Sequence, residues 1–334
     1  MKKTLPALLF SFFPCLLHTL SVVTSNFFIK DISLTINDGL SQSIAYSVRP
    51  GPGDYAFIAT QDGLNIWNGK KINLLTRGLS SNMVKDMFFF NDSTGILITS
   101  RGIDILLLSR KIEDGLIKED ITITSAIKGK YLEKIYPLTD KTSLLTDENN
   151  NIFLLFHENL NNITIKRVEH PHSGFVIPSI ENFLVFSEDE NAIYYYDSIS
   201  NSFHRKNYEL TSEIDIREMP VLLYNDILVT SSKAWQQNTK VAELPFRLQK
   251  AFYLNRTPPN FLAITEENYP VLISFLQDTI LLEKLVLSSN MSNISIYSCY
   301  QDKWGDLWLG TSSGVRFFHL LPRKNTYTHF PEYH

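Results

Sequence analysis

FIATQDGLNIW at positions 57–67, LITSRGIDIL at 97–106 and LWLGTSSGVRF at 307–317 are three copies of one pattern. In each copy a short apolar run ends in Thr or Ser, a turn with glycine follows, and a second apolar run begins. A tight hairpin needs a positive φ in its turn, which glycine adopts at no steric cost. The pattern therefore predicts β-hairpins, with turn glycines at Gly63, Gly102 and Gly314.

Four weaker copies of the hairpin fill the interval between the second and third segments. Each apolar run again ends in a hydroxyl residue, so that the seven hydroxyls are Thr60, Ser100, Thr146, Ser187, Thr230, Thr265 and Thr311. They lie 40, 46, 41, 43, 35 and 46 residues apart. Four-stranded propeller blades run about 40–50 residues, whereas a β-sandwich has no reason to repeat at that length. The spacing predicts one seven-bladed β-propeller over residues 26–334, with the seven hydroxyls at equivalent strand positions.

The composition suits a folded protein that does not bind nucleic acid. Of the 334 residues, 44% are hydrophobic and only 20% are charged, which provides a large core and argues against disorder. The net charge is −4, and no basic stripe is present that would neutralise a phosphate backbone. Only Cys299 lies beyond residue 26, so no intramolecular disulfide is expected in an exported chain.

The N-terminus has the pattern of a secretory signal peptide over residues 1–25. Two lysines precede an apolar stretch from Leu5 to Leu17, and small or β-branched residues precede a cleavage point at Asn26. The alternative is an uncleaved N-terminal anchor, which the polar His18, Thr19 and Ser21 disfavour. No later segment is apolar enough to span a membrane, so a periplasmic or otherwise exported protein is expected.

Ring closure and core packing give two further expectations. Open β edges invite aggregation, so the segments at 27–34 and 327–330 are expected in the same blade or in adjacent blades. Trp308 alternates with two leucines in a strand that is apolar on both faces, and it is expected to pack between blades.

The outer repeats carry a more specific signature: GLSQSI at 39–44, GLSSNMV at 78–84 and YQDKWGDLWLGT at 300–311. Together they resemble the two-component regulator propeller repeat, strongly over residues 27–110 and 290–320. The resemblance implies the periplasmic sensor propeller of hybrid two-component systems of Bacteroides-type bacteria, that is, the phylum Bacteroidetes. It implies a non-catalytic ligand-binding module without a cofactor, and it implies as partner an oligosaccharide, a second propeller or a membrane signal transducer. The kinase and DNA-binding modules of that family do not occur in this sequence.

No local motif assigns a catalytic, metal or ligand-binding residue. His170 and His172 have no further His or Cys nearby, and the acidic run at 188–191 lacks the order of a calcium loop, so solvated loops are expected at both. The tyrosines at 194–196 and Trp235 are expected in the core rather than stacked on a sugar. Two other hypotheses stay open: a carbohydrate-active propeller hydrolase or lyase, and a truncated sensor remnant without signalling output.

Overall fold

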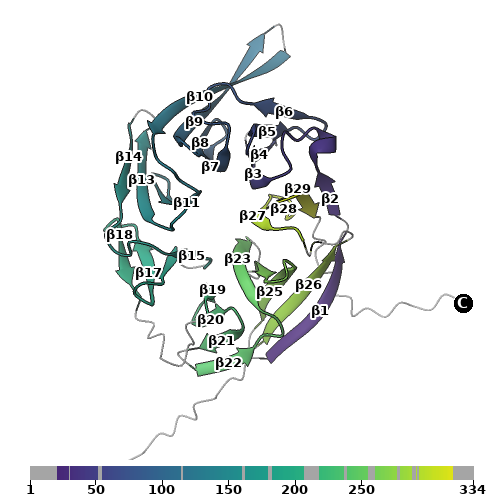
Figure 1. Ribbon diagram of the computed structural model, residues 1–334, viewed down its shortest axis with the longest axis vertical. Helices are drawn as coiled ribbons and strands as arrows, with labels where there is room; N and C mark the ends of the chain where they lie inside the picture. The colour runs from purple at the N-terminus through teal and green to yellow at the C-terminus, as the bar shows by residue number, and fades with distance from the viewer. Residues whose placement is uncertain are drawn as a thin grey trace, which may run out of the picture.

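The computed structural model describes residues 21–29, 31–51, 55–113, 116–159, 162–179, 183–206, 218–236, 239–254, 260–276, 279–287, 291 and 293–318. These residues form seven sheets, antiparallel except for one parallel pair of strands, that stand side by side around a central axis (Figure 1). Within these residues the structure is all-β apart from one 3-10 turn, η1 (Ile36–Asp38). The predicted seven-bladed β-propeller is confirmed.

Blades one to four follow the chain, each from its innermost strand outward (Figure 1). The first blade consists of β3 (Ala45–Pro50), β4 (Ala56–Thr60), β5 (Gly63–Trp67) and β6 (Ile72–Leu75). The second consists of β7 (Val84–Asn91), β8 (Thr94–Thr99), β9 (Gly102–Glu113) and β10 (Leu116–Lys128). The third consists of β11 (Lys134–Thr139), β12 (Thr142–Thr146), β13 (Ile152–Asn159) and β14 (Asn162–Arg167). The fourth consists of β15 (Phe175–Ile177), β16 (Leu184–Ser187), β17 (Ala192–Asp197) and β18 (Ser202–Arg205).

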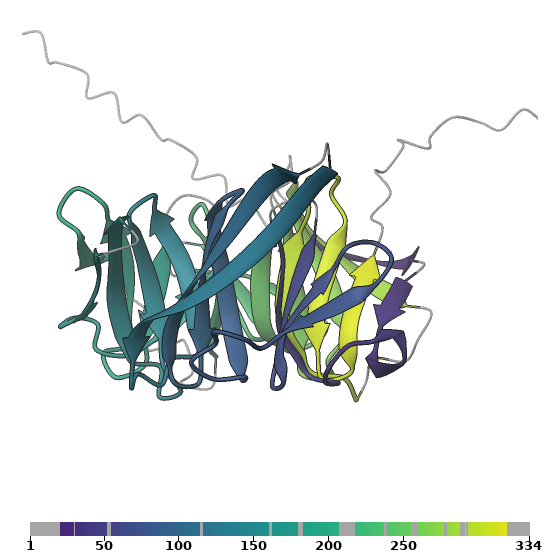
Figure 2. The ribbon, with the colours of Figure 1, turned by 90° about the horizontal axis from the view of Figure 1, so that it is seen from above.

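The remaining blades continue the same order, and the hairpin β9–β10 rises above the rest of the ring (Figure 2). The fifth blade consists of β19 (Pro220–Tyr224), β20 (Ile227–Thr230), β21 (Lys233–Gln236) and β22 (Thr239–Glu243). The sixth consists of β23 (Leu248–Leu254), β24 (Asn260–Thr265), β25 (Pro270–Leu276) and β26 (Thr279–Leu287). The seventh contains β27 (Ile296–Gln301), β28 (Leu307–Thr311) and β29 (Gly314–Phe318).

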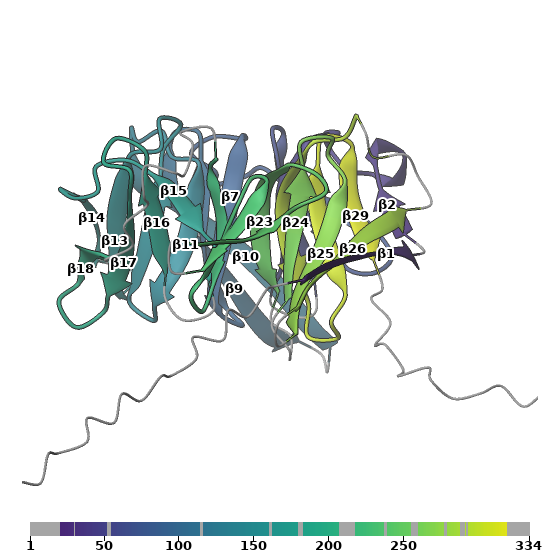
Figure 3. The same cartoon turned by 90° about the horizontal axis from the view of Figure 1, so that it is seen from below.

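An N-terminal strand closes the ring. The fourth strand of the seventh blade is β2 (Asp31–Leu34), which pairs antiparallel with β29. Just before it, β1 (Ser21–Ile29) adds a fifth strand to the sixth blade, parallel to β26 (Figure 3). The expectation that residues 27–34 share a blade, or lie in adjacent blades, with residues 327–330 stays a prediction. The segment 327–330 lies outside the described residues, and the C-terminal partner of β2 is β29.

The expected signal peptide overlaps β1. Residues 1–20 lie outside the described part of the chain, whereas residues 21–25 pair with the start of β26. Cleavage before Asn26 stays a prediction; it would leave four residues of β1 on the sixth blade. Among the described residues, no helix has the length and apolar character needed to cross a bilayer.

The repeated hydroxyls mark the end of the second strand of each blade, with one correction. Thr60 and Thr311 each donate a hydrogen bond to the carbonyl oxygen of the glycine three residues later, at 2.9 and 2.8 Å. In the second blade Thr99, not Ser100, makes this bond to Gly102 O at 3.2 Å. The prediction of Ser100 was wrong by one residue because two hydroxyl residues adjoin there, and only Thr99 is paired with the turn glycine.

The GLS motif of the first two blades ties the entering chain to this hairpin. In the first blade Asn65 Oδ1 accepts from Ser41 N at 3.0 Å, and Asn65 Nδ2 donates to Ser41 Oγ at 2.8 Å and to Thr60 Oγ1 at 3.2 Å. In the second blade the residue in the place of Asn65 is Asp104, which accepts from Ser80 N at 2.8 Å and from Ser80 Oγ at 3.1 Å. In both blades a polar side chain of the third strand therefore holds the serine of the GLS motif, through the amide of Asn65 in the first blade and through the carboxylate of Asp104 in the second.

Asp104→Asn is expected to stabilise the fold at neutral pH. Burial raises the pKa of Asp104 above its ordinary value, although the Ser80 hydrogen bonds lower it. Because the pKa of Asp104 is higher in the folded than in the unfolded chain, the free energy of unfolding falls as the pH rises from the unfolded-state pKa to the folded-state pKa. The loss of stability persists at neutral pH. We expect urea unfolding at pH 7 to show a gain of about 1 kcal/mol, the scale of one buried hydrogen-bond difference. The gain should vanish in acid, where the carboxyl is protonated; an equal effect at both pH values would contradict the electrostatic cause.

Candidate functional site

A pocket lined by aromatic side chains lies where the seventh, first and second blades meet. Its volume is about 320 Å³, near the lower end of the range for small-ligand sites, which is about 300–1,000 Å³. It lies at the ends of the innermost strands β3, β7 and β27. We call it the aromatic pocket; its described lining residues are Pro50, Gly51, Tyr55, Ala56, Trp67, Phe89, Phe90, Asn91, Asp92, Tyr300, Asp302, Lys303, Trp304 and Trp308.

The turn between β27 and β28 presents Trp304 to solvent. Asp302 Oδ1 accepts hydrogen bonds from the backbone N–H groups of Trp304 at 3.0 Å and Asp306 at 2.9 Å, as aspartate does in Asx turns. Gly305 follows with a φ of 90°, a left-handed conformation that favours glycine. The Trp304 side chain is 65% exposed, and Lys303 Nζ lies 4.4 Å from its ring centroid. The turn therefore holds a large aromatic face in water, beside a pocket.

Two further tryptophans, Trp67 and Trp308, line the aromatic pocket. Trp308 is only 9% exposed, and its ring centroid lies 5.4 Å from that of Trp67 in the first blade and 4.6 Å from that of Phe317. Its Nε1–H donates to Asp302 Oδ2 at 3.0 Å. The expectation that Trp308 packs between blades is confirmed, because its cluster joins the seventh blade to the first. The same residue also couples that core to the turn that carries Trp304.

The second blade supplies the opposite wall, and glycine positions its phenylalanine. The ring centroid of Phe89 lies 4.7 Å from that of Phe57. A Cβ at Gly51 would approach the Phe57 ring to 2.4 Å, and a Cβ at Gly95 would approach the Phe89 ring to 2.7 Å. The two glycines thus let a pair of rings pack directly on the backbone, which fixes the wall.

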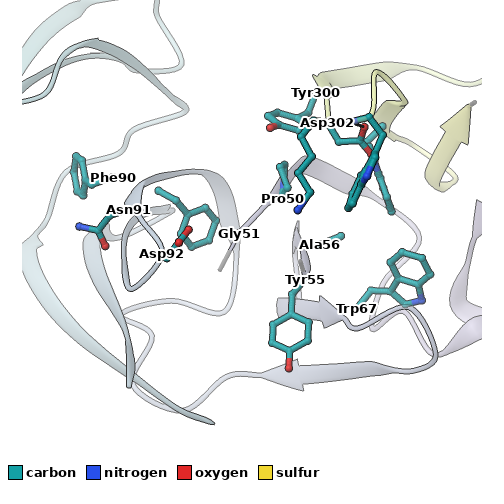
Figure 4. A pocket seen from close by; sticks show the side chains of 14 residues that line it. Pro50, Gly51, Tyr55, Ala56, Trp67, Phe90, Asn91, Asp92, Tyr300 and Asp302 are labelled. Atoms are coloured by element: carbon teal, nitrogen blue, oxygen red, sulfur yellow. Dashed lines mark hydrogen bonds between the residues drawn. The ribbon is translucent and has the colours of Figure 1, made fainter. Parts of the chain in front are cut away.

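Polar groups face each other across the aromatic pocket. Figure 4 places Asn91 and Asp92 on one side and Tyr300 and Asp302 on the other. Burial raises the pKa of the Tyr300 hydroxyl, so it stays protonated at neutral pH and can donate a hydrogen bond. Amide, phenol and carboxylate groups around aromatic faces can bind a polar ring that has apolar C–H faces.

The histidines and aromatic residues that the sequence offered as possible ligand-binding residues lie outside the aromatic pocket. The rings of His170 and His172 are 4.9 Å apart, and His170 Nδ1 lies 3.6 Å from Glu190 Oε1. No group of three metal-ligating side chains occurs among the described residues. Tyr194 and Trp235 are buried between blades, as expected, and neither lines the aromatic pocket.

The residues of the aromatic pocket were not predicted as a site. A signal was nevertheless present, because three of the four tryptophans occur in the outer repeats, at Trp67, Trp304 and Trp308. These repeats are the first and last along the chain, and closure of the ring makes them neighbours. Reading each repeat by itself hides that contact.

Comparisons with known proteins agree on the fold. No protein-family model and no curated protein matches the chain. Among solved structures, the extracellular domains of two putative hybrid two-component systems from B. thetaiotaomicron match with TM-scores of 0.60 and 0.57, each at 14% identity and over 88% of this chain. Virginiamycin B lyase from Staphylococcus aureus matches with a TM-score of 0.58 at 13% identity, over 87% of this chain and 98% of the lyase.

The match to the two extracellular domains is partial on their side. The chain spans 40% and 42% of their lengths. A structural match at 14% sequence identity establishes the propeller fold, which the repeat resemblance implied. The match covers 88% of this chain.

Proposed function

We propose that the chain is an exported sensing module that binds a glycan fragment in the aromatic pocket without converting it. The observation that carries the proposal is the 65% exposed Trp304, which Asp302 holds beside a cavity that two further tryptophans also line. Ligand-binding pockets are lined mainly by apolar and aromatic side chains with a few polar groups among them. The solved extracellular domains of two-component systems support a sensing role outside the cytoplasm.

Binding without turnover is favoured by the state of the carboxylates. Hydrolysis of a glycosidic bond by the common route needs two carboxyl groups that are free to exchange protons or attack. Among the described lining residues the carboxyl groups are Asp92 and Asp302, and Asp302 already accepts three hydrogen bonds within its own turn. Asp92 is then the one carboxylate available to a ligand, and a single carboxylate can orient a bound sugar but does not supply the pair that hydrolysis needs. A separate membrane signal transducer, or a second propeller, would then receive the signal.

Trp304→Ala is expected to weaken oligosaccharide binding at least fivefold while leaving folding unchanged. Stacking of a nucleic-acid base on one aromatic side chain contributes about 1–3 kcal/mol, and loss of a contact at the lower end of that range weakens binding about fivefold. Calorimetry of the full chain against a panel of plant and host glycan fragments gives the affinity, and thermal unfolding gives the control for folding. Tyr131→Ala is the matched variant, because Tyr131 is 72% exposed and lies outside the aromatic pocket.

The same samples separate the competing functions when their products are analysed by chromatography. Intact ligand after binding supports the sensing module, and new reducing or unsaturated ends support a hydrolase or lyase instead. A folded chain that binds no member of the panel would overturn the glycan proposal and favour a protein ligand or the sensor remnant. Equal loss in Trp304→Ala and Tyr131→Ala would remove the aromatic pocket as the site.

A further inference from the structure

The outermost strand of the sixth blade presents an open edge on the outside of the ring. β1 lies at one end of its sheet, in the order β1-β26-β25-β24-β23, so its second edge has no hydrogen-bonded strand beside it among the described residues. Its sequence, SVVTSNFFI, has nine residues and contains no charged residue, proline or glycine. Figure 1 shows this strand on the outer rim of the propeller. The sixth blade therefore ends in a long, uncharged strand edge.

The outermost strands of the other blades have the features that protect an open edge. Native proteins keep edge strands short or place charged residues on them, which prevents pairing with another chain. β2, β6 and β18 have only four residues each. β10, β14 and β22 are longer, and each contains charged residues, namely Lys118, Glu119, Asp120 and Lys128 in β10, Lys166 and Arg167 in β14, and Lys240 and Glu243 in β22. Among the outermost strands that the structure describes, only β1 is both long and uncharged.

The inner edge of β1 is paired over its whole length, which prepares the outer edge for another strand. Every residue from Ser21 to Ile29 is in register with a residue of β26, from Thr279 to Leu287, in a parallel ladder. A strand that is paired along one edge is held extended, so the N–H and C=O groups of its other edge are already lined up for a further strand. Short segments with high β-propensity, low charge and no proline are those that pair in this way most readily.

The strand that fits this edge is β1 of a second copy. Two identical strands can pair antiparallel about a two-fold axis, an arrangement that closes after two copies, and neither strand carries a charge that would oppose the approach. With the axis at Ser25, this register places Val22 opposite Phe28 and Val23 opposite Phe27 of the second copy. Pairs of a β-branched and an aromatic residue are favoured neighbours across two strands. The sequence of β1 is therefore complementary to itself.

We infer that the chain self-associates through β1, so that the sixth blades of two copies join in one continuous sheet. The contact made by a single strand edge is small compared with a standard protein interface, so the dimer should dissociate on dilution. The sixth blade does not contribute to the aromatic pocket, which lies where the seventh, first and second blades meet. The inference is thus independent of the proposed glycan binding.

Self-association of this kind requires a mature chain that keeps β1. Cleavage before Asn26 would remove most of the strand, whereas cleavage after Ser21 would keep all of it but that one residue. Signal peptidase requires small residues at two alternate positions before the cut, and Thr19 and Ser21 occupy those positions as Val23 and Ser25 do for the later cut. The intact mass of the exported chain distinguishes the two N-termini.

Sedimentation velocity of the exported chain over a concentration series tests the inference. We expect a monomer–dimer equilibrium that Ser25→Lys weakens about fivefold, because two lysines would lie directly opposite each other at the axis. Thr164→Lys is the matched control, since Thr164 is an exposed residue of β14, the outermost strand of the third blade, and should leave the equilibrium unchanged. Thermal unfolding checks that both variants fold.

Cysteine cross-linking tests the register without a change of charge. In Ser25→Cys the two introduced thiols would lie opposite each other, so a short bis-maleimide should link the two copies. Ser33→Cys, in β2 and outside the paired strand, should stay unlinked. Cys299 does not compete, because it is buried and burial raises its pKa to about 12.

Association that Ser25→Lys weakens, together with links in Ser25→Cys and none in Ser33→Cys, supports the inference. A monomer at every concentration, or equal association of Ser25→Lys and the unmodified chain, overturns it. Linking of Ser25→Cys no faster than of Ser33→Cys, or a mature chain that begins at Asn26, overturns it as well. None of these results depends on whether the aromatic pocket binds a glycan.

Discussion

Trp308→Ala should lower the free energy of unfolding by about 3–5 kcal/mol, the range for removal of a large buried aromatic side chain. Trp308 is 9% exposed and packs against Trp67 of the neighbouring blade and Phe317 of its own. Its loss would leave a cavity at the junction of the first and last blades and leave Asp302 Oδ2 without its donor. Urea denaturation followed by fluorescence and circular dichroism measures the change.

Two variants separate packing from the hydrogen bond and from ligand binding. Trp308→Phe keeps a ring in the core but removes the Nε1 donor, so we expect a loss of about 1–2 kcal/mol. Trp304→Ala, in the same turn but 65% exposed, should change stability by no more than about 0.5 kcal/mol. If Trp308→Ala kept its stability and lost only ligand affinity, Trp308 would belong to the site and not to the core.

The fold could be predicted because its information is local and repeated. An apolar run, a hydroxyl, a glycine turn and a second run are contained within about a dozen residues, so even the weak copies that end at Thr146 and Thr265 were placed at the correct strand ends. The single error, Ser100 for Thr99, came from a place where two neighbouring residues satisfied the same local rule. The hydrogen bond to the turn glycine separates them, and that bond depends on register.

The candidate site was not predicted, because it depends on contacts between distant repeats. Trp67 and Trp304 are separated by most of the chain, and they line the same pocket only because the ring closes between the first and the seventh blades. For Trp308 the local pattern was enough to predict burial, because the residue alternates with leucines. Its hydrogen bond to Asp302, in the turn that carries Trp304, was not predicted.

Closure of the ring is the remaining non-local feature, and Gly314→Ala should damage it. Gly314 has a φ of 87°, and a Cβ there would lie 2.1 Å from the carbonyl oxygen of Leu34 in the closing strand β2. That oxygen belongs to the backbone, so the closing strand itself would have to shift away from β29. We expect a loss of about 3 kcal/mol in urea denaturation, because a steric clash adds to the cost of a left-handed alanine.

Gly69→Ala separates the clash from the backbone strain. Gly69 has a closely similar φ of 85°, but a Cβ there would meet nothing within 4 Å, so this variant should lose only about 1 kcal/mol. Because a displaced β2 leaves the edge of β29 unpaired, Gly314→Ala should also associate on mild heating, which light scattering detects and which Gly69→Ala should not show. Equal losses in the two variants, without association, would mean that β2 tolerates the shift and that the ring is held by packing between blades rather than by its closing strand.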